Sequence, residues 1–167
     1  MEPDFSNKKP LKRSEHIAVL SRDHHAGLLF CWKIKEGLKR GIDPQRINPY
    51  VKYFWEEHLQ AHFREEESLL FDKLDNDLIS HAKRDHQVLT GWFKRIIHDE
   101  AESLQDYLSF TELLVSHIRF EERFLFPFLE DHLSEVVLES IGAALASNHS
   151  TPFNDTYPDE FWVRQPH

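Results

Sequence analysis

Apolar residues recur at intervals of three and four along most of the 167-residue chain, which is the spacing of one face of an α-helix. The pattern predicts four long helices, over Ser14 to Arg40, Tyr50 to Asp75, Leu78 to His98 and Ser103 to Asp131. A shorter fifth helix is expected over Ser134 to Ala146. Short connections make consecutive helices antiparallel neighbours. The expected fold class is therefore all-α, an up-down-up-down four-helix bundle with a short fifth helix.

Turn-forming residues suggest where these helices begin and where they are disturbed. Asn48 is predicted to cap the second helix, with Pro49 at its first helical position, where proline needs no N–H. Asn76 and Asp77 are expected to form the tight turn before the third helix. Pro127 is expected to kink the fourth helix or to mark its last turns.

A chain of this length is expected to fold as one domain with a sizeable core. We expect residues 1–13 to form an N-terminal arm and residues 14–147 to form the bundle. Residues 148–167 are rich in turn formers and are predicted to form an extended tail. Its aromatic residues are expected to dock it on the bundle; they are Phe153, Tyr157, Phe161 and Trp162.

Charge and composition narrow the classes of partner. The net charge of −9 argues against nucleic acid, because phosphate contacts need a surplus of lysine and arginine. Apolar residues are too dispersed to span a membrane, and no apolar stretch near the start resembles a signal peptide. Cys31 is the single cysteine, so an internal disulfide is excluded. We therefore expect a cytoplasmic protein that binds neither nucleic acid nor membrane.

An internal repeat is the most informative feature of the sequence. Two segments, beginning at His62 and His117, align without a gap and both read H-x-x-x-E-E-x-x-L-F-x-x-L. The helix before each segment carries the triplet Arg-Asp-His, which ends at His24 in one case and at His86 in the other. The chain is therefore predicted to consist of two helical hairpins of like design.

The spacing within the repeat predicts a metal site. Residues four apart on a helix share one face, with Cβ atoms about 5–6 Å apart, so each repeat presents an imidazole and a carboxylate to one point. These positions fall on the apolar faces, where an unpaired carboxylate is costly to bury and a cation offsets that cost. Counting residues from the turns places the triplet histidines, His24 and His86, at the same height along the bundle axis as the histidines and glutamates of the repeat. The candidate metal ligands are His24, His62, Glu66, His86, His117 and Glu121.

The donor types restrict the metal. Four imidazoles and two carboxylates, without a thiolate, suit iron, manganese or zinc. A single ion cannot use all six donors and keep a position open, whereas two ions that share carboxylates can. We expect two non-haem iron ions bridged by carboxylates, with manganese or zinc as alternatives.

The triplets and the two H-x-x-x-E-E segments together resemble the hemerythrin-like, or HHE cation-binding, domain over Ser14 to His132. The resemblance implies a di-iron centre in which Glu66 and Glu121 bridge the metals. It also implies that each iron takes two histidines, one ion using His24 and His62 and the other His86 and His117.

One position departs from the oxygen-carrying members of that family. Those members have two histidines four apart on the third helix, whereas the residue four before His86 is Ala82 and His81 is off that face. The chain is therefore more similar to six-ligand members, which are associated with sensing, iron handling or repair of iron centres.

The expected function is to bind O2 or NO, or to sense redox or iron status. An enzyme or repair factor that reduces peroxide or NO, or restores damaged iron centres, is the alternative, and whether the chain is an enzyme stays open. A third hypothesis is a metal-stabilised interaction module whose tail contacts a partner or forms a homodimer.

Several neighbours of the candidate ligands have more than one interpretation. His25 competes with His24, and His58 is an extra ligand, a partner of a ligand or a hydrogen-bonded core residue. Asp23 and Asp85 either orient the histidines that follow them or lie on a solvated face. The remaining glutamates are expected to be solvated or paired with Arg64 or Arg123; they are Glu65, Glu67 and Glu122.

Overall fold

The computed structural model describes residues 13–149 and 152–164, and within these ranges the regular structure is entirely helical. Two long helices are unbroken, α1 (Ala18–Lys39) and α4 (Asp77–Ile97). Two further stretches each consist of an α-helix, a wider π-helical turn and a second α-helix. They are α2 (Pro44–Phe54), η1 (Trp55–Leu59) and α3 (Gln60–Leu69), then α5 (Leu104–Phe120), η2 (Glu121–Leu125) and α6 (Phe126–His132). The last helix is α7 (Glu135–Asn148).

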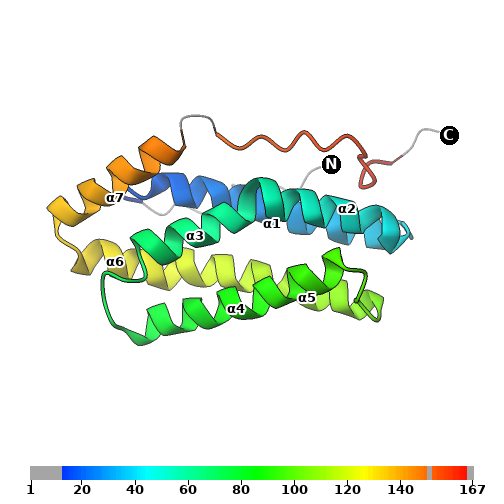
Figure 1. Cartoon of the computed structure of the whole chain (residues 1–167), viewed down its shortest axis with the longest axis horizontal. Helices are drawn as coiled ribbons and strands as arrows, with labels where there is room; N and C mark the ends of the chain where they lie inside the picture. Colours follow the sequence, from blue (N-terminus) through cyan, green and yellow to red (C-terminus); the bar gives the residue numbers. More distant parts are fainter. Residues whose placement is uncertain (1–12, 150–151, 165–167) are drawn as a thin grey trace.

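The four long helical stretches lie side by side along the long axis of the molecule (Figure 1). Helix α1 packs against α2 and α5, and α4 packs against the same two helices. Helix α7 follows α6 at one end, and residues 152–164 run back along α1 and α2 (Figure 1). Of the N-terminal arm expected over residues 1–13, residues 1–12 lie outside the described part of the chain.

The second long stretch begins earlier than the sequence pattern suggested. Asp43 is the N-cap of α2, since its carboxylate accepts the Gln45 N–H at 2.9 Å, and Pro44 occupies the first turn. The expected cap, Asn48, lies inside the helix instead. It is buried, accepts a hydrogen bond from the Tyr107 hydroxyl and donates one to the Asp99 carboxylate. The Asn48 side chain therefore makes hydrogen bonds to distant residues and does not cap the helix.

Asn76 caps helix α4 rather than sitting in a bare turn. Its side-chain oxygen accepts the Leu78 N–H at 2.7 Å, and the helix begins at the next residue. Ser134 caps α7 in the same way, by accepting the Val137 N–H at 3.3 Å.

The π-helical turns are the main irregularities of the long helices. Segment η2 ends at Leu125, two residues before Pro127, and the helix then continues as α6 to His132. Proline has no N–H to complete the ordinary helical hydrogen bond and crowds the carbonyl four residues before it, so a widened turn accommodates it without ending the helix. Segment η1 has no proline after it.

Two apolar clusters fill the interior, one toward each end of the long axis. One contains Phe30 of α1 and Leu89 of α4, and the other contains Leu20 and Ala82 from the same two helices. The candidate ligands His24 and His86 fall between these positions in sequence. The interior is therefore apolar, then polar, then apolar along each helix, which places a layer of buried polar side chains between two dry clusters.

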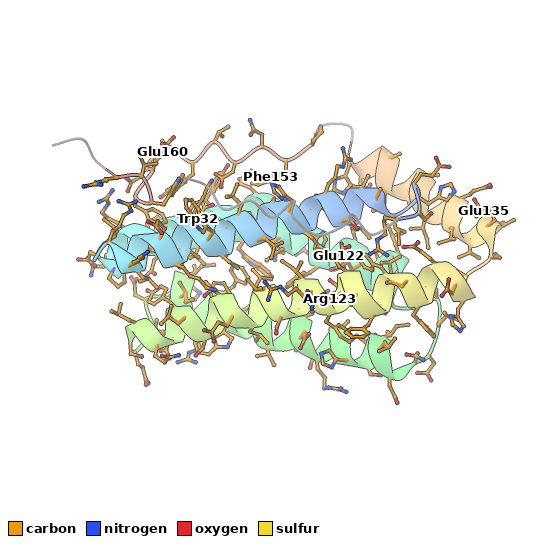
Figure 2. The ribbon with its side chains drawn as sticks, turned by 180° about the vertical axis from the view of Figure 1, so that it is seen from behind. Trp32, Glu122, Arg123, Glu135, Phe153 and Glu160 are labelled. Carbon is orange, nitrogen blue, oxygen red and sulfur yellow. The ribbon has the colours of Figure 1, made fainter. Side chains whose placement is uncertain are left out.

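The C-terminal segment is packed against the helices. Asp155 accepts a hydrogen bond from the buried Lys33 ammonium at 2.9 Å, and that ammonium lies 4.3 Å from the centre of the Trp162 ring. Phe161 is buried against Gly37, where a Cβ atom would lie 2.7 Å from the phenyl ring, so glycine is required for this contact. Figure 2 shows Phe153 between the segment and the helices.

Candidate metal centre

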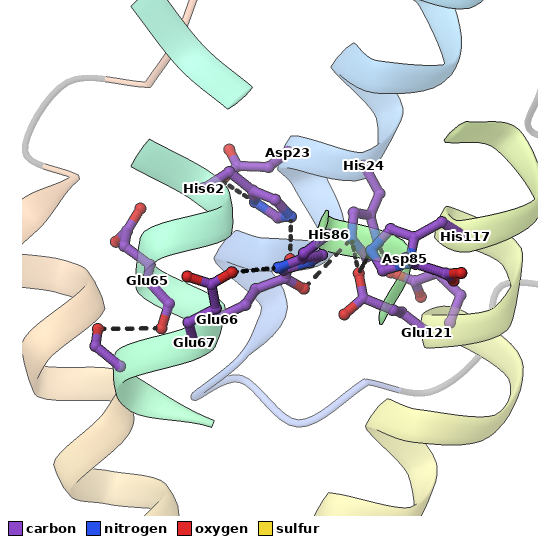
Figure 3. Close-up of polar contacts among 12 residues, drawn as sticks. Asp23, His24, His62, Glu65, Glu66, Glu67, Asp85, His86, His117 and Glu121 are labelled. Carbon is purple, nitrogen blue, oxygen red and sulfur yellow. Dashed lines mark hydrogen bonds and ion pairs between the residues drawn. The ribbon is translucent and has the colours of Figure 1, made fainter. Parts of the chain in front are cut away.

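Six buried side chains meet in the polar layer, and each comes from one of the long helical stretches (Figure 3). They are exposed by 4% or less, and they are His24 of α1, His62 and Glu66 of α3, His86 of α4, His117 of α5 and Glu121 of η2. The structure thus brings together all six residues that the repeat predicted.

The six side chains form two overlapping groups of four donors. In each group, one donor atom from every residue lies within 4.8 Å of the others. Both groups contain the carboxylates of Glu66 and Glu121. The first adds the imidazoles of His24 and His62, and the second adds those of His86 and His117. We call these the first and second half-sites.

Each shared glutamate contacts histidines of both half-sites. Glu66 Oε1 lies 3.0 Å from His62 Nε2 and 3.3 Å from His86 Nε2. Glu121 Oε1 lies 2.9 Å from His117 Nε2 and 3.3 Å from His24 Nε2. Donors about 2 Å from one ion and at right angles around it lie about 3 Å apart, so these separations suit ligands of a common ion.

The unsatisfied atoms of the described residues point to a cation. Both carboxylate oxygens of Glu66 and of Glu121 are buried without a hydrogen-bond partner, as are the Nε2 atoms of His24, His86 and His117. Buried polar atoms without partners are rare, because each forfeits the free energy of hydration. Metal ions between the two carboxylates would satisfy these atoms together, so the residues present fit a metal centre.

The other ring nitrogen of each histidine contacts a carboxylate. Within each hairpin the contact comes from the aspartate of the Arg-Asp-His triplet, with Asp23 Oδ2 at 3.0 Å from His62 Nδ1 and Asp85 Oδ2 at 2.9 Å from His117 Nδ1. The aspartates therefore orient histidines, but not the ones that directly follow them. Such a hydrogen bond fixes Nδ1 as the donor and leaves Nε2 free to bind metal.

Between hairpins the contact comes from the second glutamate of each pair. Glu122 Oε1 lies 2.7 Å from His24 Nδ1, and Glu67 Oε1 lies 3.0 Å from His86 Nδ1. Glu67 is exposed, as expected, and still reaches His86, whereas Glu122 is half-buried and pairs with Arg13 and His24 rather than with Arg64 or Arg123. Their helices pack closely enough to bring them onto the histidines of a neighbouring hairpin, and Figure 2 shows Glu122 between the helices.

The electrostatics of the layer favour positive charge. Burial alone would lower the pKa of His62, but the carboxylates of Glu66 and Asp23 outweigh it and raise the pKa well above its ordinary value. In the same way, the carboxylates of Glu121 and Asp85 outweigh the effect of burial and raise the pKa of His117 to about 10. Burial would raise the pKa of Glu121, yet the imidazoles around it hold the pKa well below its ordinary value.

Protons or metal ions can supply this charge. Six carboxylates surround four imidazoles in the layer: Asp23, Glu66, Glu67, Asp85, Glu121 and Glu122. Without metal, these carboxylates favour the protonated form of the imidazoles. With metal, the imidazoles would have to be neutral to coordinate, and the bound cation would provide the compensating charge.

The two histidines that stood as alternatives lie outside both half-sites. His25 is exposed, whereas His24 is buried and aimed at the carboxylates. His58 is buried and stacks on Phe153 with ring centres 4.2 Å apart, so it is a neighbour of the centre rather than a member of either donor group.

Ala82 lies in the apolar cluster beyond the second half-site, where it offers no donor. His81 points out of the centre, stacks on Phe120 at 4.0 Å and lies 3.3 Å from Asp85. Asp85 thus contacts an outer histidine and a candidate ligand, His117, at once.

Comparison with known protein families supplies the context for this geometry. Residues 15–129 match the family described as the hemerythrin HHE cation-binding domain. The matched range contains all six residues of the two half-sites and the four carboxylates that contact the histidines. Searches of curated proteins and of solved structures return no match. None of the described helices is long and apolar enough to cross a membrane. Since the match covers well over half of the chain, the protein belongs to the hemerythrin HHE cation-binding family.

Proposed function

We propose that this protein binds two iron ions, one in each half-site, and uses them to bind O2 or NO or to sense redox or iron status. The observation that carries the proposal is the pair of four-donor groups sharing Glu66 and Glu121. Two imidazoles and two shared carboxylates for each ion are a donor set that suits iron, manganese or zinc, and shared carboxylates are typical of di-iron helical bundles.

The surroundings of the half-sites support a ligand-binding role. Each ion would have four protein donors, which leaves coordination positions that a small diatomic molecule can occupy. Apolar rings flank the donors, with Phe63 stacked on His86 at 3.9 Å and Phe126 stacked on His24 at 5.3 Å. Such walls exclude water and admit small neutral molecules. Ala82 supplies no further imidazole, which favours a sensor over an oxygen carrier of the kind that has one.

We further infer that the long helices form an up-down-up-down four-helix bundle around these ions. Short connections, over residues 40–43, 70–76 and 98–103, join consecutive stretches. The packing of α1 and α4 on both α2 and α5 supports a closed ring of neighbours.

Stopped-flow absorbance on the ferrous protein tests the proposed function. Mixing with O2 or NO is expected to produce new absorption bands that form in proportion to bound iron and are lost in Glu66→Gln. Absence of any spectral change with both gases would contradict ligand binding. Catalytic consumption of peroxide or NO faster than with free iron would favour the enzyme instead.

A further inference from the structure

A second polar cluster adjoins the first half-site on its outer side. Asp23, Glu65 and His149 each place one donor atom within 4.8 Å of the other two. The His149 imidazole lies 2.8 Å from both carboxylate oxygens of Glu65. Asp23 and Glu65 are buried and His149 is partly exposed. Asp23 also accepts a hydrogen bond from His62, so the cluster adjoins a ligand of the first half-site.

A fourth side chain lines the same place. Hollows lined by His58, His149 and Phe153 reach Asp23 on one side and Glu65 on the other. His58 is 5% exposed, and its buried Nε2 has no hydrogen-bond partner among the described residues. His58 lines both hollows, and a buried imidazole nitrogen without a partner is rare in a folded protein, so a ligand beside it would satisfy this atom.

We propose that Asp23, Glu65 and His149 form a third cation site, open to solvent through this hollow, with His58 available as a further donor. Imidazole and carboxylate donors together select a divalent first-row metal such as zinc or ferrous iron, rather than calcium or magnesium, which prefer oxygen alone. The three donor atoms lie within 4.8 Å of one another, and zinc binds imidazole nitrogen and carboxylate oxygen at about 2.0–2.2 Å.

The third site includes residues that belong neither to the two half-sites nor to the internal repeat. His149 follows α7 and lies outside the residues 15–129 that match the family. The repeat has no counterpart for it either, since Leu113 and Phe120 occupy the positions that correspond to His58 and Glu65. The third site is therefore a feature of one half of the molecule.

Asp23 joins the third site to the first half-site. Its Oδ2 accepts the hydrogen bond from Nδ1 of His62, whose Nε2 faces Glu66. A cation on Asp23 withdraws charge from that carboxylate and weakens it as an acceptor for His62. Occupation of the outer site thereby changes the basicity of an inner ligand, as partners of metal-bound histidines generally do.

Zinc titration of the full chain tests the site independently of the metal that the centre uses. The zinc bound per chain is measured by equilibrium dialysis and metal analysis for the wild type, His149→Ala and Glu65→Gln. The variants are expected to hold the ion of the third site at least about 10-fold more weakly, so at zinc concentrations that just fill the wild-type site the wild type binds one ion more than either variant. A matched control is Glu139→Gln, which removes an exposed carboxylate from another group of two carboxylates and one imidazole, formed by His16, Glu135 and Glu139. The control is expected to keep the wild-type count.

Equal zinc counts in the wild type and both variants would overturn the third site. Because the test uses a difference, a centre that bound no zinc would lower every count equally and would leave this comparison intact. The His62 Nδ1 proton, followed by NMR in the zinc-loaded protein, provides a second readout. It is expected to shift on filling the third site in the wild type, and a shift that persists in His149→Ala would contradict coupling through Asp23.

Discussion

The two half-sites share an inner design and differ outside it. In both, two histidines face the same pair of glutamates, and each histidine contacts a carboxylate through its other nitrogen. The aspartate of the triplet acts within its own hairpin, and the second glutamate of each pair acts across to the other hairpin. The internal repeat therefore specifies ten side chains, four more than the candidate ligands themselves.

Beyond that layer the halves diverge. The first half-site borders His58, Glu65 and His149, which line a solvent-connected hollow. At the positions matching the first two, the second half-site has Leu113 and Phe120, and Phe120 is covered by His81. Ligand geometry and solvent access are therefore encoded separately: the repeat sets the ligand geometry, and the residues around it, including those at the end of α7, set the access.

The largest effect is expected from removing a shared glutamate. Glu66→Gln or Glu121→Gln takes a donor from both half-sites at once, so both ions should be lost. Glu67→Gln and Glu122→Gln are matched controls that alter only a partner of one histidine, and metal affinity should fall by about 10–100-fold. Metal analysis after gel filtration measures the outcome. Equal loss in all four variants would show that the shared carboxylates have no special role.

Removing one histidine should separate the half-sites. His117→Ala takes a donor from the second half-site alone, and His62→Ala does the same in the first. Each variant is expected to keep the ion in the half-site that remains whole, because that site retains all four donors. Metal content with iron supplied in excess checks this. Loss of both ions from either variant would mean that the centre assembles only as a unit.

The aspartates that hold the ligand histidines should matter less than the ligands. Asp23→Asn and Asp85→Asn are each expected to weaken metal binding by about 10–100-fold while leaving the donors in place. Competition with a chelator of known affinity measures the change. If the two half-sites share one design, both variants should lose metal affinity to a similar degree. A loss of affinity confined to one variant would show that the aspartates have different roles in the two half-sites.

Metal affinity should fall as the pH falls, and in both halves. The pKa values of His24, His62, His86 and His117 are raised in the metal-free protein because nearby carboxylates outweigh burial. The carboxylates therefore favour the protonated imidazoles, and metal must displace those protons. Lowering the pH from about 8 to about 6 is expected to weaken binding at least about 10-fold in buffered metal. A pH-independent affinity would contradict the proposed ligands.

The smallest effect on the centre is expected from His58→Leu, which introduces the side chain type found at the matching position of the other repeat. His58 belongs to neither half-site, so both ions should remain and the absorbance of the iron centre should be unchanged. A loss of iron from this variant would make His58 part of the centre.

The sequence predicts the all-helical fold because heptad-like spacing and caps are local properties. It also predicts which six side chains converge, because an i, i+4 pair repeated in two hairpins leaves few other geometries. It does not predict the partners of Glu67 and Glu122, which depend on how closely neighbouring hairpins pack. The place of Asn48 inside α2 and the hollow beside His149 depend on contacts between distant segments, so local patterns give no signal for them.

The proposed di-iron centre can be checked by the iron content per chain, measured together with the absorbance spectrum of the oxidised and reduced protein. Two irons per chain, in wild-type protein whose visible absorbance bleaches on reduction and is absent in Glu121→Gln, is the result that the shared-carboxylate centre predicts. A single zinc ion, unaffected by the loss of Glu121, would contradict it.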